Sequence, residues 1–303
     1  MEKKDLGFGE QGSAQSNRFI NKNGGINVIR KGLPFFRPYD LYHSLISMNW
    51  TKFITLITAS FFSINILFAL IYACLEKTAL SNLYNKSSEI QQFWDSFFFS
   101  VQTITTVGYG AMSPESNWAK IISSAESFIG LLGFALVTGL LYGRFSKPIM
   151  KIKYSKNILV APFKEGKALM FKMANQRSSK LIEAEVKVIL IGSKNGKRVY
   201  HDLPLELKKI NFFALSWTVV HPINDKSFLF QQTPKNLKEL NAEIVILVKA
   251  FDDSFSQVVY SRMSYKYNEF IWNAKFESSI FEEEGKLSID LQQMDNYIQT
   301  QES

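Results

Sequence analysis

The sequence predicts an α+β membrane protein in which two transmembrane helices precede an antiparallel β-sandwich. Two long segments without charged residues, Phe53–Leu75 and Ser127–Gly143, indicate the helices. As a helix, the 23 residues of the first segment would extend about 35 Å, which is enough to cross a hydrocarbon core of about 30 Å. From residue 155 onward, short segments alternate apolar and polar side chains, which is typical of strands with one buried face.

The second uncharged segment is shorter, and it fits a membrane span as part of a longer helix over Ala119–Ser146. This requires Lys120 and Glu126 to face protein or the outer interface, and a buried helix of a soluble protein is the alternative. In the β-region, Asn195-Gly196 is a strong turn signal. The strands expected there are Ile158–Pro162, Ala168–Ala174, residues 184–190, Arg198–Asp202, Phe212–His221, Glu243–Val248 and Gln257–Met263, with one helix over Thr233–Leu240.

The distribution of Lys and Arg predicts the orientation. Basic residues are frequent before Lys52 and again from Arg144 to Lys156, whereas the loop between the spans has only Lys77 and Lys86. The positive-inside rule then places both termini in the cytoplasm of an inner-membrane, multi-pass protein.

We expect five parts along the chain. Asp40–Met48 would form a short interfacial helix with Asp40 as its cap, although a first turn of the outer span is the alternative. Pro148 would end or kink the inner helix. The parts are a cytoplasmic N-terminal segment (1–36), an interfacial slide helix (37–48), a pore domain (49–148), a cytoplasmic β-sandwich (149–290) and a C-terminal tail (291–303).

The most informative motif lies between the two spans, where residues 105–110 read Thr-Thr-Val-Gly-Tyr-Gly. A potassium filter needs successive backbone carbonyls that all face the ion, and Gly108 and Gly110 can adopt the positive φ that this requires. We expect K⁺ to bind to the carbonyls of residues 106–109 and to the Thr106 hydroxyl, with Val107 and Tyr109 pointing outward. An ordinary hairpin turn is the alternative in a soluble protein. The filter residues are Thr105, Thr106, Val107, Gly108, Tyr109 and Gly110.

One chain supplies only a quarter of each oxygen ring, so the filter predicts a homotetramer. A pore helix over Phe93–Ile104 would direct the negative end of its dipole at the cavity, which favours a cation there.

Several other classes of function lack support. The net charge of +8 comes largely from membrane-flanking residues, so we expect no nucleic-acid partner. Cys74 is the single cysteine, and His43, His201 and His221 are isolated in sequence. No catalytic or nucleotide motif is present, so we expect neither an enzyme nor an organic cofactor. A membrane-anchored binding or signalling protein with a β-sandwich sensor remains the alternative to a channel.

Four motifs together resemble the prokaryotic inward-rectifier potassium channels, the KirBac family. They are Phe97–Thr103 leading into residues 106–110, the slide-helix residues Asp40, Tyr42, His43 and Trp50, the segment Tyr142–Pro148, and the segment Phe213–Ile223. The resemblance implies a homotetramer whose immunoglobulin-like cytoplasmic sandwiches extend the ion path. Ala111 departs from many potassium channels, which carry an acid after the filter.

The resemblance also suggests a gate. Residues of the inner helix recur at spacings of three or four, so that a subset lines the pore: Phe134, Thr138, Leu141 and Tyr142. Tyr142 would stand at the narrowest point, unless it is an aromatic anchor at the membrane interface. Phe134 occupies the position where strongly rectifying relatives carry an acid, so we expect weak rectification and weak block by a polyamine or divalent cation.

Anionic lipids are the last predicted partner. Four basic residues follow the inner helix at the depth of the cytoplasmic headgroups, where they would bind such lipids: Arg144, Lys147, Lys151 and Lys153. A purely topological role is the alternative. The sequence leaves open the gating signal, the sign of the lipid effect, and the roles of Glu126 and His43.

Overall fold

The structure is a computed structural model, and it describes residues 18–22, 24–27, 31–32, 38–76, 78–81, 88–177, 180–194 and 197–300. The chain forms two compact units. One comprises residues 33–147, and the other joins residues 148–303 to the N-terminal residues up to 32.

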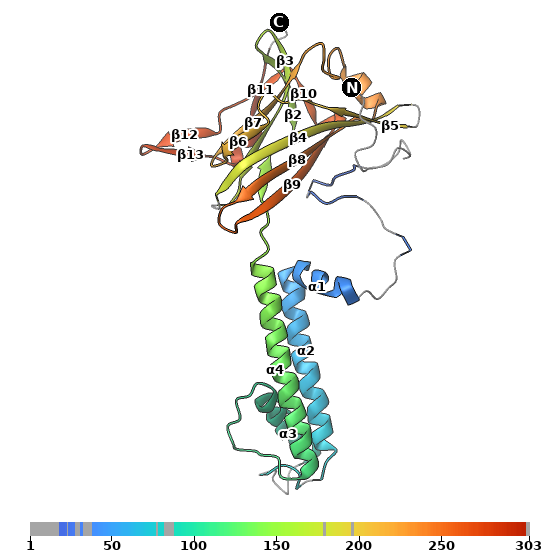
Figure 1. Ribbon diagram of the computed structural model, residues 1–303, viewed down its shortest axis with the longest axis vertical. Coiled ribbons are helices and arrows are strands. Elements are labelled where there is room, and N and C mark those ends of the chain that lie inside the picture. The colour runs from blue at the N-terminus through green and yellow to red at the C-terminus, as the bar shows by residue number, and fades with distance from the viewer. Residues whose placement is uncertain are drawn as a thin grey trace. The chain divides into compact units, whose positions relative to one another are not determined.

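The first unit is helical (Figure 1). Its elements are α1 (Pro38–Ser47), α2 (Trp50–Ala73), α3 (Glu89–Ile104) and α4 (Asn117–Phe145). The two long helices α2 and α4 run antiparallel, and the shorter α3 packs against both of them at one end. At the other end, α1 packs against α4.

Local sequence explains the ends of these helices. The Ser88 side chain accepts a hydrogen bond from the Gln91 amide, so α3 begins at Glu89, one turn earlier than expected. Helix α1 begins at Pro38, a residue suited to a first turn, so the expectation that Asp40 caps the helix was wrong. Helix α4 ends at Phe145, before Pro148, so the proline ends the helix and does not kink it.

Most of the apolar side chains of α2 and α4 are exposed in the single chain. Helix α2 has 24 residues and α4 has 29, so each is long enough to cross a membrane. A core helix of a soluble protein would bury these side chains, which argues against that alternative for α4. The exposed residues include Leu56, Phe62 and Leu67 on α2 and Phe128, Leu136 and Phe145 on α4.

The second unit contains two five-stranded sheets packed face to face. The first sheet has the order β1-β3-β2-β10, with β7 also pairing with β3, and the second has the order β5-β4-β8-β9, with β6 also pairing with β4. The bounds are β1 Ile152–Tyr154, β2 Ile158–Phe163, β3 Gly166–Asn175, β4 Leu181–Lys194, β5 Lys197–Asp202, β6 Lys209–Phe212, β7 Ser216–Ile223, α5 Pro234–Glu239, β8 Glu243–Asp252, β9 Gln257–Lys266, η1 Tyr267–Glu269 and β10 Phe270–Trp272.

Two short pairs follow in the chain, β11 (Ala274–Phe276) with β14 (Tyr297–Gln299) and β12 (Ile280–Glu283) with β13 (Lys286–Ile289). The short helix η2 (Gln292–Asp295) precedes β14. Because β14 pairs with β11, residues 291–300 belong to the β-domain, and the boundary expected at residue 290 was placed too early.

The β-domain departs from the sequence expectations in the direction and the division of its strands. The sheets are not wholly antiparallel, because β10 pairs with β2 in parallel. The strand expected over Phe212–His221 is two strands, since β6 ends at Phe212 and β7 begins at Ser216. The turn Asn195-Gly196 lies outside the described residues, which resume at Lys197 opposite Lys194.

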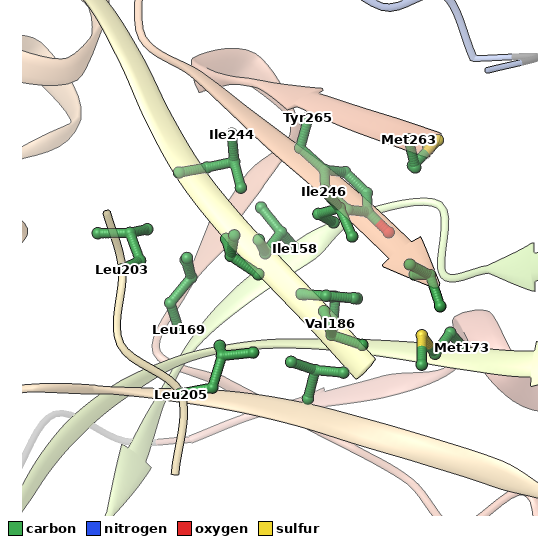
Figure 2. Close-up of a cluster of buried hydrophobic side chains, with 14 of the residues drawn as sticks. Ile158, Leu169, Met173, Val186, Leu203, Leu205, Ile244, Ile246, Met263 and Tyr265 are labelled. Atoms are coloured by element: carbon green, nitrogen blue, oxygen red, sulfur yellow. The ribbon is translucent and has the colours of Figure 1, made fainter. Parts of the chain in front are cut away.

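The core of the sandwich lies between the facing sheets (Figure 2). Ile158, Leu169 and Met173 come from the first sheet. Val186 and Ile244 come from the second sheet and point toward them. The period-two alternation over 184–190 is confirmed at Ala184, Val186, Val188 and Leu190, which are all buried in this core.

The N-terminal segment 18–27 covers part of the other face of the second sheet. Ile20 is 2% exposed and packs with Ile189, Ile191 and Val245. The Glu243 carboxylate accepts hydrogen bonds from the amides of residues 19 and 20 at 2.9–3.3 Å. This part of the segment expected over residues 1–36 is therefore integral to the β-domain.

Candidate functional site

The segment 105–110 directly follows α3, and its backbone alternates in handedness. Thr106 has φ +59°, Gly108 has φ +54° and Gly110 has φ +79°, whereas Val107 and Tyr109 are not in the positive region. Alternation of this kind turns successive carbonyls toward one side of the chain, as a filter requires. Positive φ was expected at the two glycines. Thr106 adds a non-glycine residue that costs about 1–2 kcal/mol in the left-handed region.

Hydrogen bonds to the last turn of α3 fix the start of this segment. The amides of Val107 and Gly108 both donate to the Gln102 carbonyl, at 3.0 and 3.3 Å, and the Thr106 amide donates to Thr103 at 3.1 Å. The Thr105 hydroxyl donates to the Val101 carbonyl at 2.6 Å. These bonds direct the amides of the segment toward the helix.

The filter residues are exposed in the single chain. Val107 is 51% exposed and Tyr109 is 78% exposed, so residues of the same chain do not brace their outward side chains. A Cβ added at Gly108 or Gly110 would meet no atom within 4 Å. The need for glycine there comes from the positive φ and not from lack of space.

The inner helix α4 touches the end of α3 very closely. A Cβ built on Gly130 would lie 2.2 Å from the Ile104 carbonyl oxygen, so only glycine permits this approach. One turn earlier on α4, Glu126 is fully buried and faces protein, which is one of the two orientations expected for it. Its carboxylate accepts a hydrogen bond from the Tyr72 hydroxyl at 2.7 Å.

The residues expected to line the gate lie on the last four turns of α4. Phe134 and Tyr142 are each 74% exposed, Thr138 is exposed and Leu141 is half-buried. The structure thus leaves this surface of α4 uncovered by its own chain. That it lines a pore stays a prediction.

Helix α1 and the end of α4 are joined by Arg144. Its guanidinium donates to the Leu45 carbonyl at 2.6 Å and to the Met48 carbonyl at 2.7 Å. It also lies 4.5 Å from the ring centroid of Trp50 and 4.3 Å from that of Phe53. The cation therefore satisfies carbonyls at the C-terminal end of α1, where a helix lacks its own donors.

The four basic residues expected to bind lipid are divided between the two units. Lys147 lies with Arg144 in the helical unit and donates to the Ser47 hydroxyl at 2.9 Å. Lys151 and Lys153 belong to the β-unit, where Lys151 is exposed. Lys153 donates to the Leu291 carbonyl at 2.5 Å.

Of the three histidines, His221 is buried and is held by two hydrogen bonds. His221 contacts the Pro204 carbonyl through Nδ1 at 2.5 Å and the Ser227 hydroxyl through Nε2 at 2.7 Å. Burial lowers the pKa of the His221 imidazole, and the bond to Pro204 partly opposes this effect. His43 is exposed on α1. Within the part of the chain that the structure describes, no group of His, Cys, Asp and Glu could hold a metal ion.

Comparisons with known proteins agree with this geometry. Residues 152–303 match the family model of the inward rectifier potassium channel C-terminal domain, and residues 59–147 match the ion channel family model. The inward rectifier potassium channel Kirbac3.1 of Paramagnetospirillum magnetotacticum is 35% identical over 271 residues, which cover 87% of this chain and 89% of that protein.

More distant relatives include the ATP-sensitive inward rectifier potassium channel 12 of Gallus gallus, 26% identical over 90% of this chain and 70% of the relative. The protein of the same name from Bos taurus is 25% identical with the same coverage. The resemblance inferred from the motifs is thereby confirmed, and the chain belongs to the family of prokaryotic inward-rectifier potassium channels.

Proposed function

We propose that this channel conducts potassium passively through a homotetrameric pore, in which residues 106–109 of four chains form stacked rings of oxygen ligands. The alternating handedness at Thr106, Gly108 and Gly110 is the observation that carries this proposal. The exposure of Val107 and Tyr109 also supports it, because bracing contacts for these side chains must come from other chains.

Flux into proteoliposomes tests the filter. We expect rubidium uptake that barium blocks, with little sodium uptake. Replacing Gly108 by Ala forces an L-residue into a left-handed conformation and should reduce the ratio of rubidium to sodium uptake. Gly133→Ala is the matched control, since a Cβ there meets no atom within 4 Å on an ordinary helix. Equal sodium and rubidium uptake by the unaltered protein would overturn the proposal.

The gate that we propose is a ring of Tyr142 side chains at the end of the inner helices. Its support is the exposure of Tyr142 on the last turns of α4, together with the ability of aromatic constrictions to stop ions by dewetting. Phe134 presents no charge to a polycation, which supports weak rectification.

Anionic lipids and the β-domain would modulate this gate from the cytoplasmic side, where both termini of the inner-membrane channel would lie. Each basic residue near an anionic membrane surface contributes about 1 kcal/mol to the free energy of binding to that surface. Lys147 and Lys151 are exposed and suited to this role, together with Arg144 and Lys153 if they exchange their present carbonyl partners for a headgroup. If neutralising Lys147 and Lys151 leaves the dependence of flux on anionic lipid unchanged, these residues have only a topological role.

A further inference from the structure

A small polar cluster lies in the apolar interior between α2, α3 and α4. It comprises Asn65 and Tyr72 from α2, Ser100 from α3 and Glu126 from α4. Asn65, Ser100 and Glu126 are 0% exposed, and Tyr72 is 2% exposed. Burying these polar groups is costly unless each finds a hydrogen-bond partner.

The hydrogen bonds of the cluster form a chain. The Asn65 amide nitrogen donates to the Phe61 carbonyl at 2.8 Å, which directs the amide oxygen to the Ser100 hydroxyl at 3.0 Å. The same hydroxyl contacts one carboxyl oxygen of Glu126, and the Tyr72 hydroxyl donates to the other at 2.7 Å.

Counting hydrogens in this chain defines the form of the acid. A hydroxyl has one proton and the amide oxygen of Asn65 can only accept, so Ser100 satisfies both neighbours only if it donates to Asn65 and accepts from Glu126. The contact between Ser100 and Glu126 then contains a hydrogen only if the carboxyl group supplies it. None of the ion pairs among the described residues involves Glu126. The chain of bonds is complete with Glu126 as a neutral carboxylic acid.

The cluster lies one helical turn from the contact that supports the filter. Ser100 precedes Ile104 by four residues on α3, and Glu126 precedes Gly130 by four residues on α4. The close approach of Gly130 to the Ile104 carbonyl therefore continues the same line of contact between the two helices. Gln102, whose carbonyl holds two filter amides, lies between these two levels on α3.

We propose that Glu126, as a neutral acid, is a positioning residue for the filter. It links α2 and α4 to Ser100, so that the last turn of α3 keeps the position from which it holds residues 106–108. The proposal rests on the proposed filter, and it adds a determinant of ion selectivity that touches no ion.

The ratio of rubidium to sodium uptake in proteoliposomes tests this role, because the ratio does not depend on how many channels are active. In tetramers verified by size-exclusion chromatography, Glu126→Gln should keep the ratio, since the amide can donate to Ser100 and accept from Tyr72. Glu126→Leu and Ser100→Ala should each lower it by about tenfold, the factor for one buried hydrogen bond of about 1.4 kcal/mol. Ser124→Ala is the control, because Ser124 is exposed on α4 and bonds only within its helix.

Two results would overturn the proposal. If tetrameric Ser100→Ala and Glu126→Leu keep the wild-type ratio of rubidium to sodium uptake, the cluster has a packing role only. If Glu126→Leu does not assemble, Tyr72→Phe takes its place. A neutral Glu126 should give the infrared carbonyl band of a protonated carboxyl group, and this band should be missing in Glu126→Gln. If the two spectra do not differ in this band, Glu126 is not a neutral acid. Non-selective flux in the unaltered protein would instead reject the proposed filter itself.

Discussion

The guanidinium of Arg144 donates to the carbonyl of Leu45 at 2.6 Å, so the last turn of α4 is bonded to the last turn of α1. A second bond to Met48 and the faces of Trp50 and Phe53 complete the surroundings of this cation. A change in the position of α4 at this level must therefore move α1 or break these contacts.

Replacing Arg144 by Lys should weaken this junction while keeping the charge. An ammonium group cannot reproduce the two-pronged donation of the guanidinium, and we expect a loss of about 1–3 kcal/mol. Thermal unfolding of the purified protein measures this loss as a lower midpoint. Lys147→Gln is the control, because Lys147 is exposed and its change should stay within about 0.5 kcal/mol. Equal midpoints for the two variants would contradict a stabilising role for the contacts between Arg144 and α1.

Gly130→Ala should abolish selective flux or assembly. The new Cβ would lie 2.2 Å from the Ile104 carbonyl oxygen, and a backbone carbonyl cannot move aside without displacing the end of α3. Gly133→Ala, three residues later, meets no atom within 4 Å and should gain up to about 1 kcal/mol of helix stability. Rubidium uptake by both variants checks the prediction, which fails if they behave alike.

Phe134→Asp should raise block by polyamines. In the proposed pore, four carboxylates in a low dielectric would attract a polycation, whereas the uncharged Phe134 side chains would not. Outward and inward current with spermine on the cytoplasmic side would show the change as stronger rectification. Leu136→Asp, at a similarly exposed position of the same helix, is the control. Unchanged block in Phe134→Asp would mean that Phe134 does not face the pore.

Tyr142→Ala should increase the open probability, because in the proposed gate the loss of the aromatic rings would widen and wet the constriction. Single-channel recording measures the effect, and Tyr142→Phe should keep the wild-type behaviour. If both variants gate normally, Tyr142 is an anchor at the membrane interface.

The β-domain should lose stability in mild acid through His221. Burial lowers the pKa of this imidazole, so the unfolded chain binds more protons than the folded chain below the ordinary value of about 6.5. Its contribution is fully present above that pH and is lost as the pH falls toward the folded-state pKa. Thermal midpoints of the full-length protein between about pH 7 and pH 5 should fall less in His221→Gln than in wild type. An unchanged pH slope would contradict this assignment.

Sequence patterns predicted those features that depend on neighbours along the chain. The uncharged spans, the glycines of the filter and the alternation over 184–190 are of this kind, because periodicity and positive φ are properties of local residues. The hydrogen bonds of Arg144 to α1 were missed. Their acceptors lie almost a hundred positions earlier and are backbone carbonyls, which every residue carries. Ile20 was missed for a similar reason, because a single apolar residue in a polar segment has no periodicity.

The attachment of residues 18–27 to the β-domain gives the pore unit two tethers of unequal length. The Asn27 amide donates to the Phe19 carbonyl within this segment, and α1 begins at Pro38, whereas α4 ends at Phe145 and β1 begins at Ile152. The first connection is taken from Asn27 to Pro38 and the second from Phe145 to Ile152. Fully extended, the first connection spans at most about 40 Å and the second about 25 Å. The shorter connection therefore limits the distance between the C-terminal end of α4 and the β-domain more tightly than the longer connection limits the distance between the β-domain and α1.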